Sequence, residues 1–176
     1  MLQTRILIIE DHVLVREAMA LTLAQVCDGV SCQQASSATE AIAMLEANPD
    51  CDLLVVDLML PEINGFSLLG VIAKRFPDVP ALVVSALDDR DSVQRAMKAG
   101  ASGFVSKASP SNTLIEAVRT ILAGGVFTPE AASGPVTDSG GRTRRASQAF
   151  AERFQLTAAQ GRVLELVAQG KSNRDI

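Results

Sequence analysis

The chain has 176 residues, 48% of them hydrophobic, which is enough apolar material for one good-sized domain and part of a second. This composition excludes a chain that is disordered throughout. The absence of an apolar run of about 18 residues, and of a signal-peptide layout, predicts a cytoplasmic protein without a membrane span. Residues 1–133 carry 9 basic and 16 acidic side chains, a net charge of −7, whereas residues 134–176 have a net charge of +3, which indicates two modules with different partners.

Short runs of β-branched residues alternate with helical patterns through the first 126 residues. Strands are expected at residues 5–9, 30–35, 52–57, 81–85 and 103–107. Helical patterns are expected at residues 13–26, 41–47, 65–76, 88–100 and 109–125. Strands that alternate with helices in this way form right-handed crossovers and a parallel sheet. The predicted fold class is therefore α/β, a doubly wound sheet of five parallel strands in the order 2-1-3-4-5 with helices on both faces.

The last two helices of this region carry recognisable signals at their ends. Gly100 is expected to stop the fourth helix. Ser109 is expected to cap the fifth, with Pro110 at the first helical position and Gly124–Gly125 as the stop. Between these ends, apolar residues recur at i, i+3, i+4, i+7 and i+8 and form one apolar face, consisting of Leu114, Ala117, Val118, Ile121 and Leu122.

The cysteines Cys27, Cys32 and Cys51 form no CxxC pair and are odd in number. We interpret them as buried, reduced thiols. Redox and metal-binding roles are not expected of them.

The composition changes after residue 126. Residues 127–147 are rich in Gly, Ser, Thr, Pro and Arg, which predicts a flexible linker. Its basic stretch, with Arg142, Arg144 and Arg145, is interpreted as solvated, and auxiliary contact with DNA phosphates is the alternative. Helical periodicity returns at residues 148–169.

Polar side chains stand at the carboxyl ends of four predicted strands. The first ends in Glu10 and Asp11, the third in Asp57, the fourth in Ser85 and the fifth in Lys107. Ligands of doubly wound sheets bind beyond these ends, and the first and third strands are neighbours in the 2-1-3-4-5 order. Three converging carboxylates repel one another unless a cation neutralises them, and Mg²⁺ is a hard ion that prefers oxygen ligands. The three carboxylates, the charge of Lys107 and the hydroxyl of Ser85 together form a binding site for a phosphoryl group, with Asp57 as the nucleophile.

The motifs IIEDH, VVDLMLPEING, VVSA and GFVSK occur in the order and at the separations of one known family. On these motifs, residues 1–126 resemble the receiver domain of a two-component response regulator. The resemblance implies that Asp57 accepts phosphate from a phosphohistidine on a sensor histidine kinase, and that Lys107 pairs with the phosphate. It also implies a Mg²⁺ site whose ligands are Glu10, Asp11, Asp57 and the backbone carbonyl of Met59. Such a chain is a phosphoacceptor switch with at most slow self-dephosphorylation, not an enzyme.

The resemblance further implies a switch pair formed by Ser85 and Phe104. In this family Thr is commoner at the first of these positions and Tyr is a frequent alternative at the second. Neither difference is expected to prevent phosphoryl transfer. Phosphorylation is expected to pull Ser85 toward the phosphate and to turn Phe104 inward, which would alter the face formed by residues 88–122. We also expect that a helical face of this domain supports a homodimer on phosphorylation.

Other α/β interpretations fail on specific residues. A dinucleotide-binding fold requires GxGxxG after the first strand, where this chain has EDHVLV. Haloacid dehalogenase phosphatases also use a strand-end aspartate, but they place a second aspartate two residues later, where this chain has Met59. His12, the single histidine, is interpreted as a turn residue beside the site, with a phosphohistidine or a metal ligand as the less favoured alternative.

The segment LTAAQGRVLELVAQGKSNRDI resembles the start of the helix-turn-helix domain of NarL/FixJ (LuxR-type) regulators. Residues 148–176 are therefore predicted to be the N-terminal fragment of that all-α DNA-binding domain. The recognition helix of this family comes later and is absent here, so we expect DNA recognition of the full-length protein only. The chain is thus interpreted as a phosphorylation-activated transcription regulator; the alternative is a receiver that acts only through protein contacts and has a vestigial tail.

Overall fold

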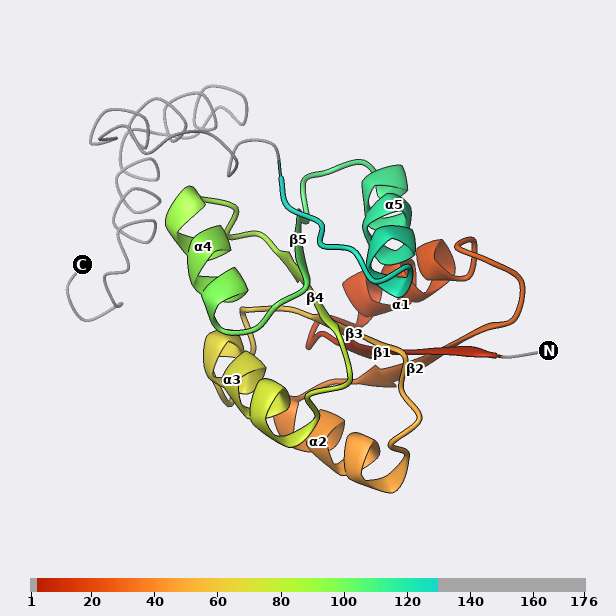
Figure 1. Ribbon diagram of the computed structural model, residues 1–176, viewed down its shortest axis with the longest axis horizontal. Helices are drawn as coiled ribbons and strands as arrows, with labels where there is room; N and C mark the ends of the chain where they lie inside the picture. Colours follow the sequence, from red (N-terminus) through yellow and green to blue (C-terminus); the bar gives the residue numbers. More distant parts are fainter. Residues whose placement is uncertain (1–2, 130–176) are drawn as a thin grey trace. The chain divides into compact units, whose positions relative to one another are not determined.

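The computed structural model describes residues 3–129, in which strands and helices alternate along the chain (Figure 1). The strands are β1 (Thr4–Ile9), β2 (Val30–Ala35), β3 (Leu53–Val56), β4 (Ala81–Ser85) and β5 (Gly103–Ser106). The helices are α1 (Val13–Leu23), α2 (Ala38–Ala47), α3 (Gly65–Arg75), α4 (Arg90–Lys98) and α5 (Ser111–Leu122). None of these described helices combines the length and the apolar character needed to cross a membrane. The predicted helix-turn-helix fragment and the predicted linker from residue 130 onward lie outside the described residues.

The five strands pair in parallel in the order β2-β1-β3-β4-β5, which confirms the predicted fold class. Every residue of β3 and β4 is buried, because helices cover both faces of the sheet. This explains why their sequences are continuous apolar runs. The register brings the carboxyl ends of neighbouring strands level, since Ile9 lies opposite Val56 and Ser85 lies opposite Ser106. The residues that follow these strands therefore emerge at one edge of the sheet.

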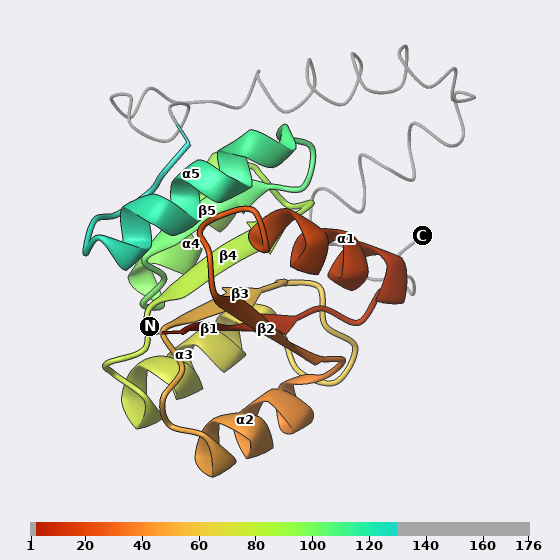
Figure 2. The same ribbon diagram turned by 90° about the vertical axis from the view of Figure 1, so that its right-hand side faces the viewer.

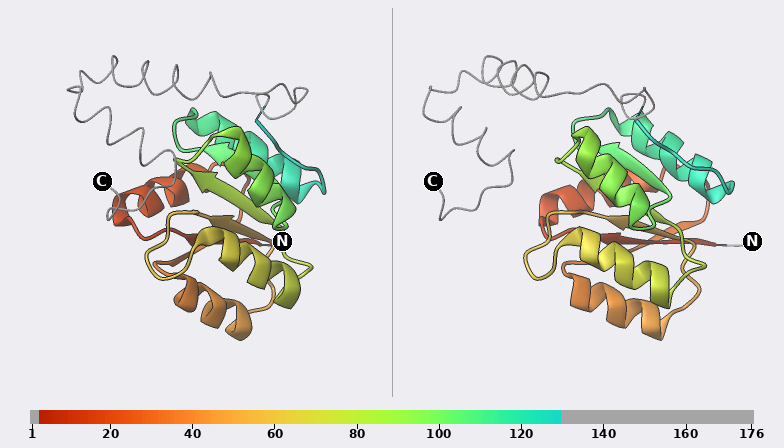
Figure 3. Two further views of the ribbon diagram at one scale, coloured as in Figure 1. Left: turned by 90° about the vertical axis from the view of Figure 1, so that its left-hand side faces the viewer. Right: turned by 60° about the vertical axis from the view of Figure 1, so that its left-hand side comes forward.

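Two hydrophobic layers hold the helices on the sheet. One layer lies under α1 and α5 and includes Leu23 and Val118. The other lies under α2, α3 and α4 and includes Leu45, Leu68 and Val93. Figure 2 shows α1 and α5 on the side of the sheet opposite to α2 and α3. Figure 3 shows α2, α3 and α4 in a row along their face.

Helix α5 has the predicted apolar face but begins later than predicted. The apolar residues are buried or partly buried under the helix: Leu114, Ala117, Val118, Ile121 and Leu122. Pro110 occupies the N-cap position with an extended ψ of 152°, and no side chain caps the helix, so the prediction that Ser109 is the cap is wrong. Because this ψ is not helical, the helix begins at Ser111, and the N–H of Ser109 instead donates to the carbonyl of Ser106. Of the three glycines predicted to stop α4 and α5, two have positive φ, +109° at Gly100 and +88° at Gly124, and Gly125 does not.

The folded unit extends past the predicted boundary at residue 126. Phe127 lies beside β5, where its carbonyl accepts the N–H of Phe104 at 2.9 Å and its N–H donates to the carbonyl of Ser102 at 3.1 Å. Its partly buried side chain packs on the layer under α1 and α5. Phe127, predicted to be the first linker residue, therefore belongs to the folded unit, and the change in composition begins after it.

The cysteines are free thiols, as predicted, but the prediction that they are buried is wrong. Cys27 is exposed in the turn after α1, because the preceding Val26 takes the core position there. Cys32 and Cys51 are partly buried, and burial raises the pKa of both thiols above its usual value.

Candidate functional site

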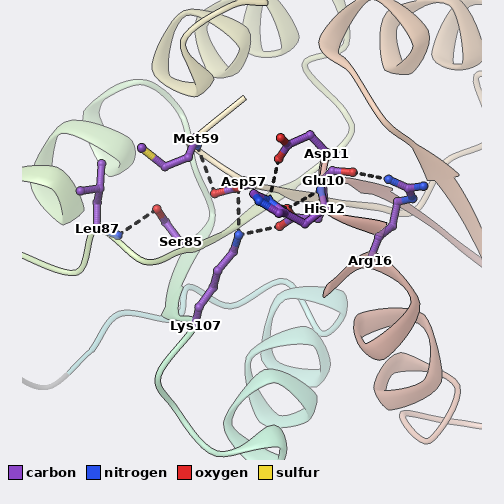
Figure 4. A network of polar contacts seen from close by, with 9 residues as sticks. All are labelled: Glu10, Asp11, His12, Arg16, Asp57, Met59, Ser85, Leu87 and Lys107. Carbon is purple, nitrogen blue, oxygen red and sulfur yellow. Dashed lines mark hydrogen bonds and ion pairs between the residues drawn. The ribbon is translucent and has the colours of Figure 1, made fainter. Parts of the chain in front are cut away.

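The buried polar and charged residues of the described structure all stand at the carboxyl edge of the sheet. They are Glu10 after β1, Asp57 after β3 and Ser85 at the end of β4. The parallel ladder continues beyond the strands: the N–H of Asp57 donates to the carbonyl of Ile9 at 3.0 Å, and that of Lys107 donates to the carbonyl of Ser85 at 2.9 Å. The backbone thus brings together four side chains that the sequence places up to 97 positions apart, from Glu10 to Lys107 (Figure 4).

Lys107 reaches between the two buried carboxylates. Its Nζ donates to Oδ2 of Asp57 at 2.9 Å and lies 2.6 Å from Oε2 of Glu10 in an ion contact without hydrogen-bond alignment. Glu10 is 0% exposed and Asp57 is 1% exposed, so one ammonium group serves two shielded negative charges. Burial alone lowers the pKa of Lys107, but its contacts with Glu10 and Asp57 outweigh burial, and the pKa lies above its usual value. Lys107 is therefore held in its charged form at neutral pH.

The loop between β3 and α3 holds the other oxygen of Asp57. Oδ1 accepts the N–H of Met59 at 3.1 Å, so each oxygen of the carboxylate has one donor. The chain then folds back tightly: a Cβ at Gly65 would lie 2.4 Å from the Cα of Leu58 and 2.8 Å from the carbonyl oxygen of Asp57. The N–H of Gly65 donates to the carbonyl of Leu58 at 3.1 Å. Only glycine fits this close approach, which fixes the loop that carries Met59.

The acidic pair after β1 lies against a histidine and an arginine. The backbone N–H of His12 donates to Oε1 of Glu10 at 3.0 Å, and the ring Nδ1 lies 3.2 Å from that oxygen and 3.1 Å from Oδ1 of Asp11. His12 precedes α1 with a side chain that is 69% exposed, which agrees with its interpretation as a turn residue beside the site. Arg16 was not among the predicted site residues, yet it donates to the backbone carbonyl of Glu10 at 2.6 Å. The signal for it was a basic residue in the first turn of the helix that follows the acids.

The donor set at this edge suits a hard divalent cation. Ligand atoms of Glu10, Asp11 and His12 lie within 4.8 Å of one another. Oδ1 of Asp11 is buried and accepts no hydrogen bond from any residue that the structure describes, although the ring of His12 is close. Three carboxylates with one lysine leave an excess of negative charge, which Mg²⁺ would neutralise through oxygen ligands. The oxygens of Asp57 face other donors in this conformation, and the predicted ligand set that includes Asp57 stays a prediction.

Ser85 and Phe104, predicted as a switch pair, are both completely buried. Oγ of Ser85 accepts the N–H of Leu87 at 3.1 Å and is thereby directed at the loop after β4 (Figure 4). The ring of Phe104 lies in the layer under α2, α3 and α4. The ring therefore lies inward in this structure, and its predicted response to phosphorylation stays a prediction.

The chain is similar to known proteins over most of its length. A family model described as the response regulator receiver domain matches residues 6–119. A glycerol metabolism activator of Pseudomonas putida is 31% identical over 174 residues, which are 98% of this chain and 79% of the relative. The nitrate/nitrite response regulator protein NarL of Escherichia coli is 30% identical over 173 residues, 97% of this chain and 78% of the relative. The crystal structure of a LuxR family DNA-binding response regulator from Silicibacter pomeroyi has a TM-score of 0.65 and 29% identity, and covers 73% of this chain and 98% of its own.

Proposed function

Because this chain belongs to the response regulator receiver family, among two-component regulators of the NarL/LuxR type, we propose that Asp57 is the residue that accepts the phosphoryl group. Receivers of this family are phosphoacceptor switches rather than enzymes, and the family implies a cognate histidine kinase. One observation carries the assignment: the carboxylate of Asp57 is buried at the carboxyl edge of the sheet, with the ammonium group of Lys107 2.9 Å from Oδ2.

In the proposed transfer, a carboxylate oxygen of Asp57 attacks the phosphorus of a phosphohistidine on the kinase. The new P–O bond forms as the P–N bond breaks, and the imidazole leaves with the bonding electrons. Lys107 supplies positive charge to the phosphoryl oxygens, where negative charge accumulates. The N–H of Met59 holds the attacking carboxylate in one orientation. Since Glu10 also contacts Lys107, the ammonium group keeps a partner when Asp57 becomes an acyl phosphate.

We also propose that Mg²⁺ binds at this edge, with Glu10, Asp11, Asp57 and the backbone carbonyl of Met59 as ligands. Receiver domains typically use Mg²⁺ for phosphorylation, where the ion offsets the charge of the carboxylates and of the incoming phosphoryl group. The buried Oδ1 of Asp11 supports this site, because a carboxylate oxygen without a hydrogen bond is costly unless a cation accompanies it. Arg16 supports it by holding the backbone of Glu10.

The proposed output is phosphorylation-dependent regulation of transcription. Support comes from the NarL relative, a nitrate/nitrite response regulator protein, and from the matched structure of a LuxR family DNA-binding response regulator. The segment expected to carry this output, residues 148–176, lies outside the described residues. The receiver and its acceptor residue can be tested independently of that segment.

The test compares the parent chain with Asp57→Asn, incubated with acetyl phosphate and Mg²⁺ and analysed by intact mass. We expect addition of one phosphoryl group to the parent, loss of this addition in EDTA, and no addition to Asp57→Asn, because the amide is not a nucleophile. Asp52→Asn is the matched control, since Asp52 is exposed at the opposite end of β3 and an amide oxygen can still accept the N–H of Arg5. Mg²⁺-dependent addition to Asp57→Asn would refute the assignment.

A further inference from the structure

The hydroxyl of Ser106 connects the two loops that flank the switch residue Ser85. Ser106 ends β5 and lies opposite Ser85 in the parallel register. Its Oγ donates to Oδ2 of Asp88, in the loop after β4, at 2.8 Å. The same oxygen accepts the N–H of Ala108, in the turn that follows Lys107, at 3.2 Å. One hydroxyl therefore ties the loop between β4 and α4 to the turn that carries the phosphate-binding lysine.

This connection bears on the direction in which Ser85 points. Asp88 is bonded covalently to Leu87, whose N–H donates to Oγ of Ser85 at 3.1 Å. While Ser106 holds Asp88, the N–H of Leu87 stays within reach of Ser85. Rotation of the Ser85 hydroxyl toward Asp57 breaks this hydrogen bond. The N–H of Leu87 then has no acceptor, which costs free energy unless the loop moves with Ser85. Movement of Ser85 and release of the loop are therefore coupled.

The restraint also reaches the start of α4. Asp89 follows Asp88 and caps α4, with Oδ1 accepting the N–H of Ser92 at 2.9 Å and Oδ2 accepting its hydroxyl at 2.6 Å. A loop that is fixed at Asp88 therefore fixes the residue at which α4 begins. Release of the loop is a route by which a change at Ser85 reaches this helix.

We propose that Ser106 is a positioning residue that favours the unphosphorylated arrangement, because its hydrogen bond to Asp88 keeps the Leu87 N–H on Ser85 and opposes movement of Ser85 toward a phosphoryl group. This inference rests on the proposed function, since a phosphoryl group on Asp57 is what attracts Ser85. A ligand shifts a two-state equilibrium through its different affinity for the two states. Removal of the Ser106 hydroxyl therefore makes the phosphoryl-bound arrangement easier to reach.

The test uses beryllofluoride, an analogue of the acyl phosphate, with Mg²⁺ and the whole 176-residue chain. We compare the parent with Ser106→Ala, Ser106→Thr, which keeps a hydroxyl, and Ser109→Ala, which removes a hydroxyl from the same turn. Dissociation constants come from fluorine NMR. Hydrogen exchange of the Leu87 amide, measured without ligand, shows directly how often the loop releases this N–H from Ser85.

Ser106→Ala is expected to bind beryllofluoride about threefold to tenfold more tightly, the range that corresponds to one hydrogen bond, and to exchange its Leu87 amide faster. Ser106→Thr and Ser109→Ala are expected to behave as the parent. Unchanged or weaker binding by Ser106→Ala would overturn the inference while leaving the proposed function intact. Failure of the parent itself to bind beryllofluoride with Mg²⁺ would refute the proposed function, and this inference with it.

Discussion

At the scale of single residues, Lys107 has the most demanding position, because its ammonium group is shared by two nearly fully buried carboxylates. Glu10 and Asp57 lie 2.6 Å and 2.9 Å from Nζ. Because both carboxylates are buried, the lysine that we propose for phosphoryl transfer is also expected to stabilise the unmodified fold. The proposed function and the stability of the fold are therefore linked at one side chain.

We predict that Lys107→Met lowers the free energy of unfolding at neutral pH by about 1–3 kcal/mol, because two buried carboxylates lose their shared cation. The pKa of Lys107 is raised above its usual 10.5 in the folded state, so its stabilising contribution is fully present below pH 10.5 and is lost as the pH rises through the folded-state pKa. Urea unfolding of the two proteins from pH 7 to 11 checks this. The difference in the free energy of unfolding between the parent and Lys107→Met should become smaller above pH 10.5. A difference that does not depend on pH would contradict the charge-based explanation.

The control for this experiment is Lys74→Met on α3. Lys74 is exposed, so the substitution should change the free energy of unfolding by less than about 0.5 kcal/mol. A loss as large as that of Lys107→Met would show that the destabilisation is not specific to the lysine between the two buried carboxylates.

At the scale of secondary-structure elements, α3 carries a geometric requirement of the site at its first residue. A Cβ at Gly65 would overlap the backbone of Leu58, whereas a Cβ at Gly70, five residues farther along the same helix, would meet nothing within 4 Å. The structure therefore requires glycine at position 65 but not at position 70. The first permits close approach to the strand end that carries Asp57, and the second has no steric reason in the structure.

Gly65→Ala is predicted to cost about 2–4 kcal/mol of folding free energy, because backbone atoms that cannot rotate away must shift. Gly70→Ala should stabilise the chain by up to about 1 kcal/mol, the difference in helix propensity between the residues. Urea denaturation of both variants measures the two changes in the free energy of unfolding, which are expected to have opposite signs. Equal effects of the two substitutions would mean that the close approach at Gly65 is not a constraint on the fold.

At the scale of the whole folded unit, sequence patterns predicted the sheet and the group of site residues but not their connections. Continuous apolar runs such as Leu53–Val56 are typical of strands covered on both faces, and parallel order then brings their ends together. The contact between Ser106 and Asp88 depends on the register of β5 against β4, which no local pattern encodes. The inward ring of Phe104 depends on space in a layer that three helices build.

The central claim is that Asp57 carries the phosphoryl group, and chemical mapping tests it most directly. Borohydride reduces an aspartyl phosphate to homoserine, which peptide mass spectrometry locates in the chain. After incubation with acetyl phosphate and Mg²⁺, we expect homoserine at position 57 alone. We expect no homoserine when EDTA is added or when acetyl phosphate is left out. Homoserine at another aspartate, or a phosphoryl group found on His12 with Asp57 unmodified, would contradict the account.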